Sequence, residues 1–393
     1  MNAVRTSTVG AAALALLVCG CLAATTGAVR RQSAPADIPK TLTVTAPGTL
    51  TDAREPQATV DEAGRVYVTF GAGNAVYCAT SRDRGKTYAA PVKVAEAGEL
   101  MLGMRRGPRI AARGKTLAVS AIYGQQGKGR DGDILAWRST DGGKTWRGPA
   151  TVNDVPGAAR EGLHGMAAAQ DGKLACVWLD LRGGKGTRIF AAVSHDDGAT
   201  WGRNQLVYRS PDGTVCECCH PSVAYDAKGR LFVMWRNALG GARDMYLTTS
   251  SDGGKTFAPA QKLGDGTWTL QACPMDGGAI AVSPDGKTVD TFWRRAGEMY
   301  ACAGAPGEPE RPVGRGEQGW TAFGPGGPYR VWLARRPGAL RVQTPGARDP
   351  ITLAHDADDP VVAAAPNGRG PVVVVWKGDP RSGASIQSAV LSR

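Results

Sequence analysis

Apolar and polar residues alternate in short runs along most of the chain, and this period of two is typical of a β-strand with one buried face. Each run is followed by a turn rich in glycine, aspartate or asparagine, and then by a second run that ends in an aromatic residue. The copies begin at Pro56, Pro108, Gly165, Pro221 and Gly278, and two less regular copies begin at Thr321 and Pro360. The pattern predicts an all-β fold of short antiparallel strands.

A shorter motif follows the first four strand pairs at almost equal intervals. Its copies are SRDRGKTY (81–88), STDGGKTW (139–146), SHDDGATW (194–201) and SSDGGKTF (250–257). An aspartate in a turn accepts hydrogen bonds from backbone amides, and glycine adopts the positive φ that such a turn needs. We therefore expect Asp83, Asp141, Asp196 and Asp252 to close hairpins and the aromatic ring to pack in the core. This role is structural, not chemical.

Together the two motifs define a repeating unit of four strands, the size of one propeller blade. The chain contains seven such units, and the last lacks one strand. Residues 41–46 (TLTVTA) could supply that strand and close the ring, which would remove exposed sheet edges. The sequence thus favours seven blades of four antiparallel strands, with six as the alternative if residues 320–355 are an insertion.

The shorter motif resembles the Asp-box, or BNR repeat, of the sialidase superfamily. The repeat covers residues 41–393, although the motif is intact only in the first four units. The resemblance implies a single β-propeller domain, usually six-bladed in sialidases and sometimes seven-bladed in their relatives. Asp-box propellers include exo-sialidases, other glycosidases, sorting receptors and assembly factors, so the motif indicates the fold better than the function.

The N-terminal segment has the features of an export signal. Residues 1–20 include an apolar stretch of signal-peptide length, and the sequence around Cys21 resembles a bacterial lipobox, with Cys21 as the lipidated first mature residue. Residues 22–40 are predicted to form a tether. We expect an exported monomer, either a cell-envelope lipoprotein held to the membrane by this anchor or a freely secreted periplasmic or extracellular protein.

The formal charge of +12 is spread along the whole chain. The chain contains neither a block of like charges nor an aromatic-basic motif, so its sequence does not indicate nucleic-acid binding. A diffuse positive field instead favours anionic partners, of which an acidic glycan is the expected one.

The inner strands of a propeller converge on a central funnel, and charged residues recur near the ends of these strands. The resemblance implies an arginine set that binds a substrate carboxylate, for which we consider Arg109, Arg182, Arg236 and Arg294. It also implies a Tyr–Glu pair and an aspartate, for which the candidates are Tyr300 with Glu298, and Asp180 or Asp276. The family's Arg-Ile-Pro signature has only Arg109-Ile110-Ala111 as a counterpart, after the first Asp-box instead of before it.

Three functions therefore remain open. The chain is an exo-glycosidase of the exo-alpha-sialidase type, a non-catalytic module that docks another envelope protein, or a metal-handling protein that uses the cysteines at 216–219 and 273. A complete Tyr–Glu–Asp set beneath three arginines would favour the enzyme.

Cysteines are concentrated in VCECCHP (215–221) and in ACPMDGG (272–278), and both segments lead into inner strands of neighbouring units. One interpretation is a disulfide from Cys273 to Cys216, Cys218 or Cys219, with no cofactor. The alternative is a soft metal site for copper or zinc, built from these four cysteines with His220, and with Met275, His164 and Met166 nearby.

Overall fold

The computed structural model describes residues 38–127, 129–303, 308–379 and 386–392. The predicted signal segment 1–20, Cys21 and residues 22–37 of the predicted tether lie outside this range. Within it, all the elements are β-strands, so the all-β prediction is confirmed. No helix in the described part of the chain is long and apolar enough to cross a membrane.

The strands form antiparallel sheets in which neighbours in the chain are neighbours in the sheet. The first sheet contains β2 (Arg54–Val60), β3 (Val66–Ala72), β4 (Ala75–Ser81) and β5 (Val92–Glu96). The second contains β7 (Arg109–Arg113), β8 (Thr116–Gly124), β9 (Asp133–Ser139) and β10 (Arg147–Thr151), with the short β6 (Glu99–Leu100) beside the end of β8.

Three more sheets of four strands follow the same order. The third contains β11 (His164–Ala168), β12 (Leu174–Asp180), β13 (Arg188–Ser194) and β14 (Gln205–Tyr208). The fourth contains β15 (Ser222–Tyr225), β16 (Leu231–Arg236), β17 (Met245–Ser250) and β18 (Gln261–Lys262). The fifth contains β19 (Ala279–Val282), β20 (Val289–Arg295), β21 (Glu298–Ala303) and β22 (Arg311–Arg315).

The last sheet is longer, because one strand belongs to two parts of it. It contains β23 (Glu317–Gly324), β24 (Gly327–Leu333), β25 (Gly338–Gln343), β26 (Ile351–Ala364), β27 (Val372–Lys377), β28 (Ile386–Ser392) and β1 (Leu42–Thr43). The first half of β26 pairs with β25, and its second half pairs with β27. Leu42 pairs with Ser388 and Thr43 with Gln387, so residues near the start of the chain do pair with its last strand, as the sequence predicted.

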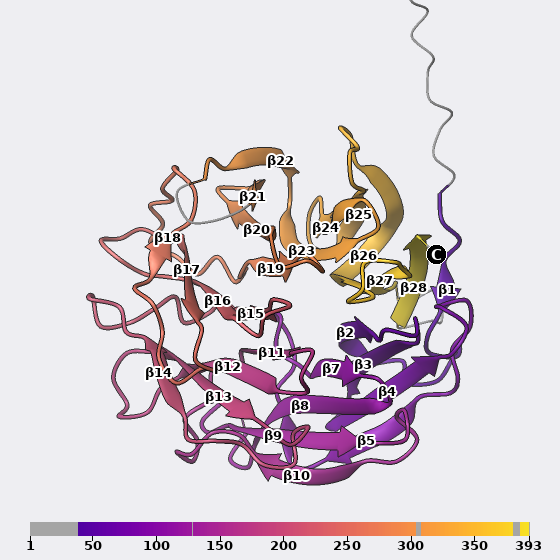
Figure 1. Cartoon of the computed structure of the whole chain (residues 1–393), viewed down its shortest axis with the longest axis horizontal. Helices are drawn as coiled ribbons and strands as arrows, with labels where there is room; N and C mark the ends of the chain where they lie inside the picture. The colour runs from indigo at the N-terminus through magenta and orange to yellow at the C-terminus, as the bar shows by residue number, and fades with distance from the viewer. Residues whose placement is uncertain (1–37, 128, 304–307, 380–385, 393) are drawn as a thin grey trace, which may run out of the picture. The chain divides into compact units, whose positions relative to one another are not determined.

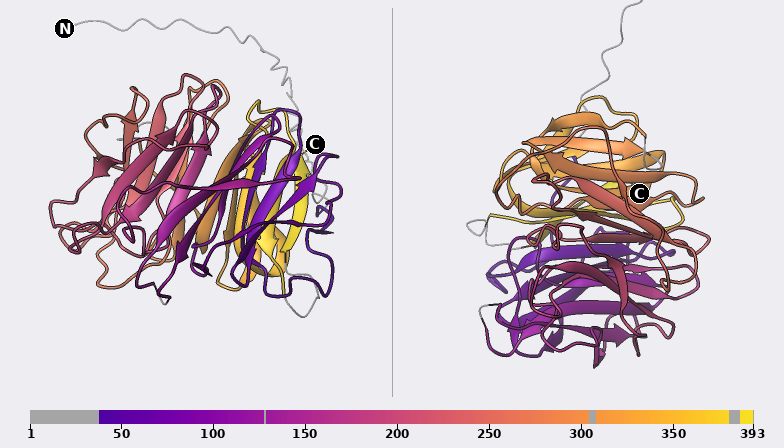
Figure 2. Two further views of the ribbon diagram at one scale, coloured as in Figure 1. Left: turned by 90° about the horizontal axis from the view of Figure 1, so that it is seen from below. Right: turned by 90° about the vertical axis from the view of Figure 1, so that its left-hand side faces the viewer.

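The first strand of each sheet lies nearest the common centre (Figure 1). Contacts run from β2 to β7, β11, β15, β19, β23 and β26 in turn, and from β26 back to β2. The strands, although antiparallel to their neighbours, lie along similar axes, so the connecting loops gather at two opposite ends (Figure 2). One end therefore collects the residues that begin every first strand.

The four Asp-box motifs form the same hydrogen-bonded turn. In the first motif, Asp83 Oδ1 accepts hydrogen bonds from Ser81 Oγ (2.8 Å), Lys86 N (3.1 Å) and Thr87 N (2.9 Å). Asp83 Oδ2 accepts one from Thr87 Oγ1 (2.6 Å). The hydrogen bonds from Thr87 are the main reason why the pKa of Asp83 falls to about 2. Asp141, Asp196 and Asp252 accept equivalent bonds from their own serine and threonine.

The aromatic residue of each motif packs between its own sheet and the preceding one. Trp146, for example, contacts a core cluster that contains Tyr67 of the first sheet and Leu117 of the second. The glycine of the turn is also close to the preceding sheet. A Cβ atom on Gly254, whose φ is +83°, would lie 2.9 Å from Val193 Cγ2. Each motif thus joins two sheets while it closes a hairpin.

Candidate functional site

Buried polar residues collect at the end where the first strands begin. They include Glu55, Arg109, His164, Asp276, Gln318 and Asp359, each nine-tenths or more buried. Three of them have left-handed backbone conformations, with φ values of 54° at Glu55, 57° at Gln318 and 48° at Asp359. Non-glycine residues rarely adopt this conformation, and such strain often accompanies functional sites. At each of these three residues the strand pairing contains a bulge, and the three bulges bring unlike polar side chains to the same end of the ring.

The Arg105 side chain lies at the central axis of the ring at this end and blocks it. Its guanidinium donates to the carbonyl oxygens of Pro360 (3.0 Å) and Gln318 (2.6 Å), which lie in β26 and β23 of the last sheet. It also lies over the Trp320 ring, 5.3 Å from the centroid, and the His220 ring stacks on the same indole at 5.6 Å. The pocket between the first strands, which Gln57, Arg109 and Trp320 help to line, has a volume of only about 50 Å³. Ligand pockets usually measure about 300–1,000 Å³, so a sugar would have to displace this plug.

The guanidinium groups of two predicted anion-binding arginines donate hydrogen bonds to backbone carbonyl oxygens. Arg109 donates to the carbonyl oxygens of His164 (2.9 Å) and Arg105 (2.6 Å), and Arg236 donates to those of Asp276 (3.0 Å) and Arg294 (2.8 Å). Both side chains are buried. In this arrangement Arg109 of β7 braces the start of β11, and Arg236 of β16 braces the segment before β19 and the end of β20.

The predicted arginine Arg294 is partly exposed and has weaker partners. Its Nη1 lies 3.4 Å from Glu317 Oε2, and its guanidinium lies 5.7 Å from the centroid of the Trp268 ring. Trp268 also lies near the Arg236 guanidinium, so these two predicted residues come together at one indole.

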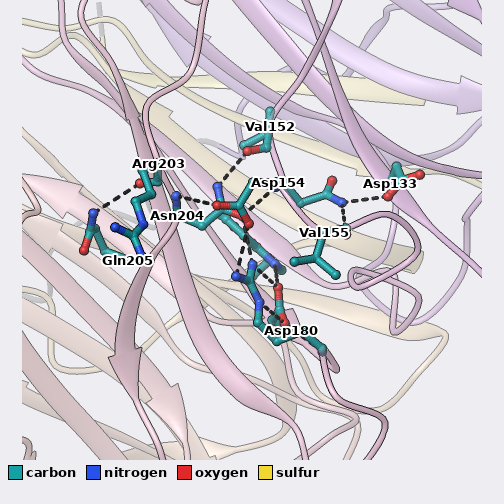
Figure 3. A network of polar contacts seen from close by, with 11 residues as sticks. Asp133, Val152, Asp154, Val155, Asp180, Arg203, Asn204 and Gln205 are labelled. Carbon is teal, nitrogen blue, oxygen red and sulfur yellow. Dashed lines mark hydrogen bonds and ion pairs between the residues drawn. The ribbon is translucent and has the colours of Figure 1, made fainter.

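Asp180 and Arg182 belong to a different network, shown in Figure 3. Arg182 binds Asp180 Oδ1 (2.8 Å), Asp154 Oδ1 (3.1 Å) and Asn204 Oδ1 (2.9 Å). Asp180 is fully buried and also accepts the indole N–H of Trp178 (2.8 Å). The network joins loops of the second and third sheets, and its polar atoms satisfy one another.

Tyr300 and Glu298 lie on β21, the third strand of their sheet, and not on a first strand. The Arg295 guanidinium covers the Tyr300 ring at 3.9 Å from the centroid. Glu298 pairs across the ladder with Arg315 of β22. This pair therefore lies on the third strand of its sheet, whereas Asp276 lies just before β19, the first strand of the same sheet.

The axial carboxyl groups are held in an unusual electrostatic environment. Asp276 Oδ2 accepts the backbone N–H of Gln318 (2.8 Å), while its Oδ1 has no hydrogen-bond partner among the described residues. Burial raises the pKa of Asp276. Burial, and then the charge of Asp359, raises the pKa of Glu55 to about 8. Burial lowers the pKa of His220 well below its usual value, so this imidazole is neutral at pH 7.

A larger cleft lies beside the axis, between loops of the second and third sheets. It has a volume of about 450 Å³ and is lined by Glu99, Leu100, Met101, Leu102, Arg106, Arg160 and Glu161, with glycines 124, 127 and 129. Arg106 Nε donates to the Glu161 carbonyl oxygen (2.7 Å), which fixes one wall. Burial, followed by the charge of Glu217, raises the pKa of Glu161. The sequence indicated charged residues near the ends of inner strands, but it did not indicate that the folded loops bring Glu99 and Arg160 to Arg106 and Glu161.

The cysteine cluster is compact. The Sγ atoms of Cys216, Cys218 and Cys219 lie 3.4–3.9 Å apart. The Cys273 thiol is within hydrogen-bonding reach of Cys218. All seven cysteines in the described part of the chain are free thiols. His220 follows Cys219 in the sequence, but its ring stacks on Trp320 at the axis.

Residues 106–288 match the family model of the BNR repeat-like domain. The matched segment spans slightly less than half of the chain. The resemblance to Asp-box propellers, inferred from the four short motifs, is thereby confirmed. No curated protein matches the chain.

Several solved structures are similar to this chain. The GH93 alpha-L-arabinofuranosidase of Fusarium graminearum has a TM-score of 0.54 at 13% identity, covering 90% of this chain and 97% of its own. The alpha-L-arabinanase of Penicillium chrysogenum has a TM-score of 0.53 at 15% identity, covering 90% and 99%. A Hadza microbial sialidase has a TM-score of 0.51 at 15% identity, covering 87% and 66%. At these identities the likeness shows the fold, which matches that of propeller enzymes.

Proposed function

We propose that this protein binds an acidic glycan in the cleft beside the axis and removes a terminal sugar from it. The observation that carries the proposal is the position of Glu161. This carboxyl group, whose pKa is raised by burial, lies in a cleft of ligand size together with two arginines and a second carboxylate. The similarity to sialidases and arabinofuranosidases supports a reaction at a glycosidic bond.

Arg106 and Arg160 are the residues proposed to bind the acidic group. Two of the Arg106 nitrogens are engaged by the Glu161 and Gly103 carbonyl oxygens, which hold the guanidinium in one orientation. Arg160 is exposed and free to adjust to a ligand. A planar guanidinium matches a carboxylate in a bidentate way, so the pair would favour an acidic sugar over a neutral one.

Glu161 is the proposed proton donor, and Glu99 is the proposed second carboxylate. A glycosidase needs one carboxylic acid that stays protonated near neutral pH and one carboxylate that stays ionised. Glu161 is half-buried and has a raised pKa, whereas Glu99 is exposed to water. The two environments therefore differ in the direction that the reaction requires.

The test uses fluorogenic N-acetylneuraminic acid and arabinofuranose glycosides with the whole chain. We expect turnover of the acidic substrate, a loss of about 10²–10⁴-fold in kcat for Glu161→Gln, as for other general acids, and a KM about 10–100-fold higher for Arg160→Ala, the effect of one charged hydrogen bond. Arg209→Ala, also an exposed arginine, should leave both constants unchanged.

A second measurement separates binding from catalysis. Titration calorimetry with sialyllactose reports binding even when nothing is cleaved. Binding that depends on Arg160 without turnover would replace the glycosidase with a glycan-binding module. Absence of both binding and turnover would reject the acidic glycan itself.

We further infer a ring of seven blades. The two halves of β26 pair with different neighbours, so this strand can serve as the outer strand of one blade and the inner strand of the next. Pairing of β1 with β28 then completes the last blade with four strands.

We also propose export and membrane anchoring through lipidation of Cys21. This segment lies outside the described residues, and the proposal rests on its sequence. Cys21→Ser should move the protein from the membrane fraction to the soluble fraction of a bacterial cell. Unchanged membrane association of that variant would contradict the anchor.

A further inference from the structure

We propose that Cys216, Cys218 and Cys219 bind one copper(I) ion. The three residues belong to the segment between β14 and β15, and all three side chains are buried. Their ligand atoms all lie within 4.8 Å of one another. None of the three cysteines lines the cleft assigned to the glycan, and the inference does not depend on that function.

The spacing of the sulfur atoms fits a shared metal ion. The three Sγ–Sγ distances are 3.7 Å for Cys216–Cys218, 3.4 Å for Cys216–Cys219 and 3.9 Å for Cys218–Cys219. With metal–sulfur bonds of about 2.3 Å, thiolates around one ion would lie about 3.8 Å apart in a tetrahedron and about 4.0 Å apart in a plane. A disulfide needs about 2.05 Å, so forming one would require the sulfur atoms to move together.

The backbone holds the triangle in place before any ion binds. The Cys216 N–H donates to the Arg236 carbonyl oxygen (3.1 Å), and the Val215 N–H donates to the Thr187 carbonyl oxygen (3.0 Å). The Glu217 carboxylate accepts a hydrogen bond from Thr214 Oγ1 (2.8 Å), which ties this intervening residue to its own loop. The backbone amides of Val215 and Cys216, at the start of the segment, are therefore both hydrogen-bonded to neighbouring strands or loops.

The surroundings match a soft cation of low charge. Met275 packs against the cluster of the three cysteines, and a thioether beside thiolates is a donor set that copper(I) prefers. The positive charges of Arg236 and Arg243 act on Cys216, which offsets the negative charge of a thiolate complex. On binding, each thiol that becomes a ligand loses its proton to solvent, and no electron is transferred.

Zinc would need a fourth ligand. Structural zinc sites are four-coordinate, and the available fourth thiol is Cys273, which is exposed and contacts only Cys218 of the triangle. The buried set of three therefore favours copper(I), and Cys273 distinguishes the two metals experimentally.

The test is an anaerobic titration of the reduced full chain with copper(I) in competition with bathocuproine disulfonate. We expect one copper(I) per chain. Cys216→Ser and Cys219→Ser should each weaken binding by more than about 100-fold, beyond the loss seen for outer-shell changes. Cys273→Ser should change copper affinity by less than about tenfold. Cys78→Ala removes a buried cysteine elsewhere, in β4, and should have no effect.

X-ray absorption of the copper-loaded wild type gives a readout that does not depend on the folding of any variant. Three sulfur neighbours at about 2.3 Å would support the site. The inference is overturned if a Cys216→Ser/Cys218→Ser/Cys219→Ser chain binds copper(I) as tightly as the wild type. It is also overturned if zinc binds one per chain, with loss in Cys273→Ser, while copper(I) does not. A protein that is two mass units lighter after purification and binds no copper after reduction would favour the disulfide instead.

Discussion

The sheets that carry an Asp-box and the sheets that lack one hold to their neighbours in different ways. From β2 to β18, each sheet has a short turn whose aspartate, serine and threonine bond one another and whose aromatic ring packs on the preceding sheet. The hydrogen bonds of each turn join residues no more than four positions apart in sequence. Every sheet of this half repeats the same solution.

From β19 onwards the chain uses long-range connections. Asp290 of the fifth sheet accepts hydrogen bonds from Arg330 Nε (3.1 Å) and Thr321 Oγ1 (2.6 Å) of the last sheet, and it also pairs with Arg330 Nη2. Both charged side chains are almost fully buried, with 4% and 0% exposure. In addition, β26 runs through two parts of the last sheet. A buried charge pair and a shared strand take the place of the repeated turn.

The comparison separates two kinds of sensitivity. Each exposed local turn contributes a modest amount to the stability of the fold, and the loss of one turn leaves the others intact. A buried ion pair is different, since removal of one partner leaves the other charge without compensation in a low dielectric. We therefore expect the half without Asp-boxes to depend more on single residues.

The largest expected effect is that of Arg330→Leu. This change leaves the Asp290 carboxylate buried and unpaired, which should destabilise the fold by about 3–5 kcal/mol. Chemical denaturation followed by tryptophan fluorescence measures the change. Lys287→Leu is the control, because its partner Asp285 and Lys287 itself are both exposed. Equal losses in the two variants would contradict the proposed difference.

A smaller effect is expected from Ser250→Ala in the fourth Asp-box. The buried Ser250 Oγ accepts the Gly254 N–H (2.9 Å) and donates to Asp252 (2.7 Å). Its loss leaves a buried N–H without a partner, at a cost of about 1–3 kcal/mol. Ser251→Ala changes the adjacent exposed serine and should be nearly neutral. If Ser251→Ala were as destabilising, the hydrogen-bonded turn would not be the cause.

The smallest expected effect is that of Asp83→Asn, whose effect on stability should depend on pH. Since hydrogen bonds lower the pKa of Asp83 from its usual value to about 2, the stabilisation by its charged form is complete above about pH 4 and is lost as the pH falls towards 2. Asp83→Asn should therefore be less stable than the wild type at pH 6, and the two should converge near pH 2. Hydrogen exchange of residues 81–88 at several pH values measures this convergence. A constant difference across the range would argue against the lowered pKa.

The sequence was sufficient for the parts of the fold that repeat locally. Alternation and the Asp-box gave the strand pairs of the first sheets, and the TLTVTA segment indicated the pairing of β1 with β28. It did not indicate the continuity of β26, because HDADDP in its middle reads as a polar turn. In the fold these residues lie where the strand passes from β25 to β27.

The candidate site was harder to predict, because it depends on loops from different sheets. Arg105 carries no motif, yet it reaches Gln318 and Pro360 across the axis. Arg109 and Arg236 had the residue type and strand position of ligand-binding groups. Only the backbone carbonyl oxygens around them revealed their bracing contacts. The cysteine segment was recognisable from its composition, whereas the spacing of its sulfur atoms required the structure.

The pairing of Leu42 with Ser388 also has a mechanical consequence. Any pull transmitted through the N-terminal segment would act first on a two-residue strand at the edge of the last sheet, where the bonds would break one after another. The chain's seam would thus open at a lower force than the rest of the ring. Joining the two ends and cutting a surface turn elsewhere should yield a circular permutant in which that weak point is gone.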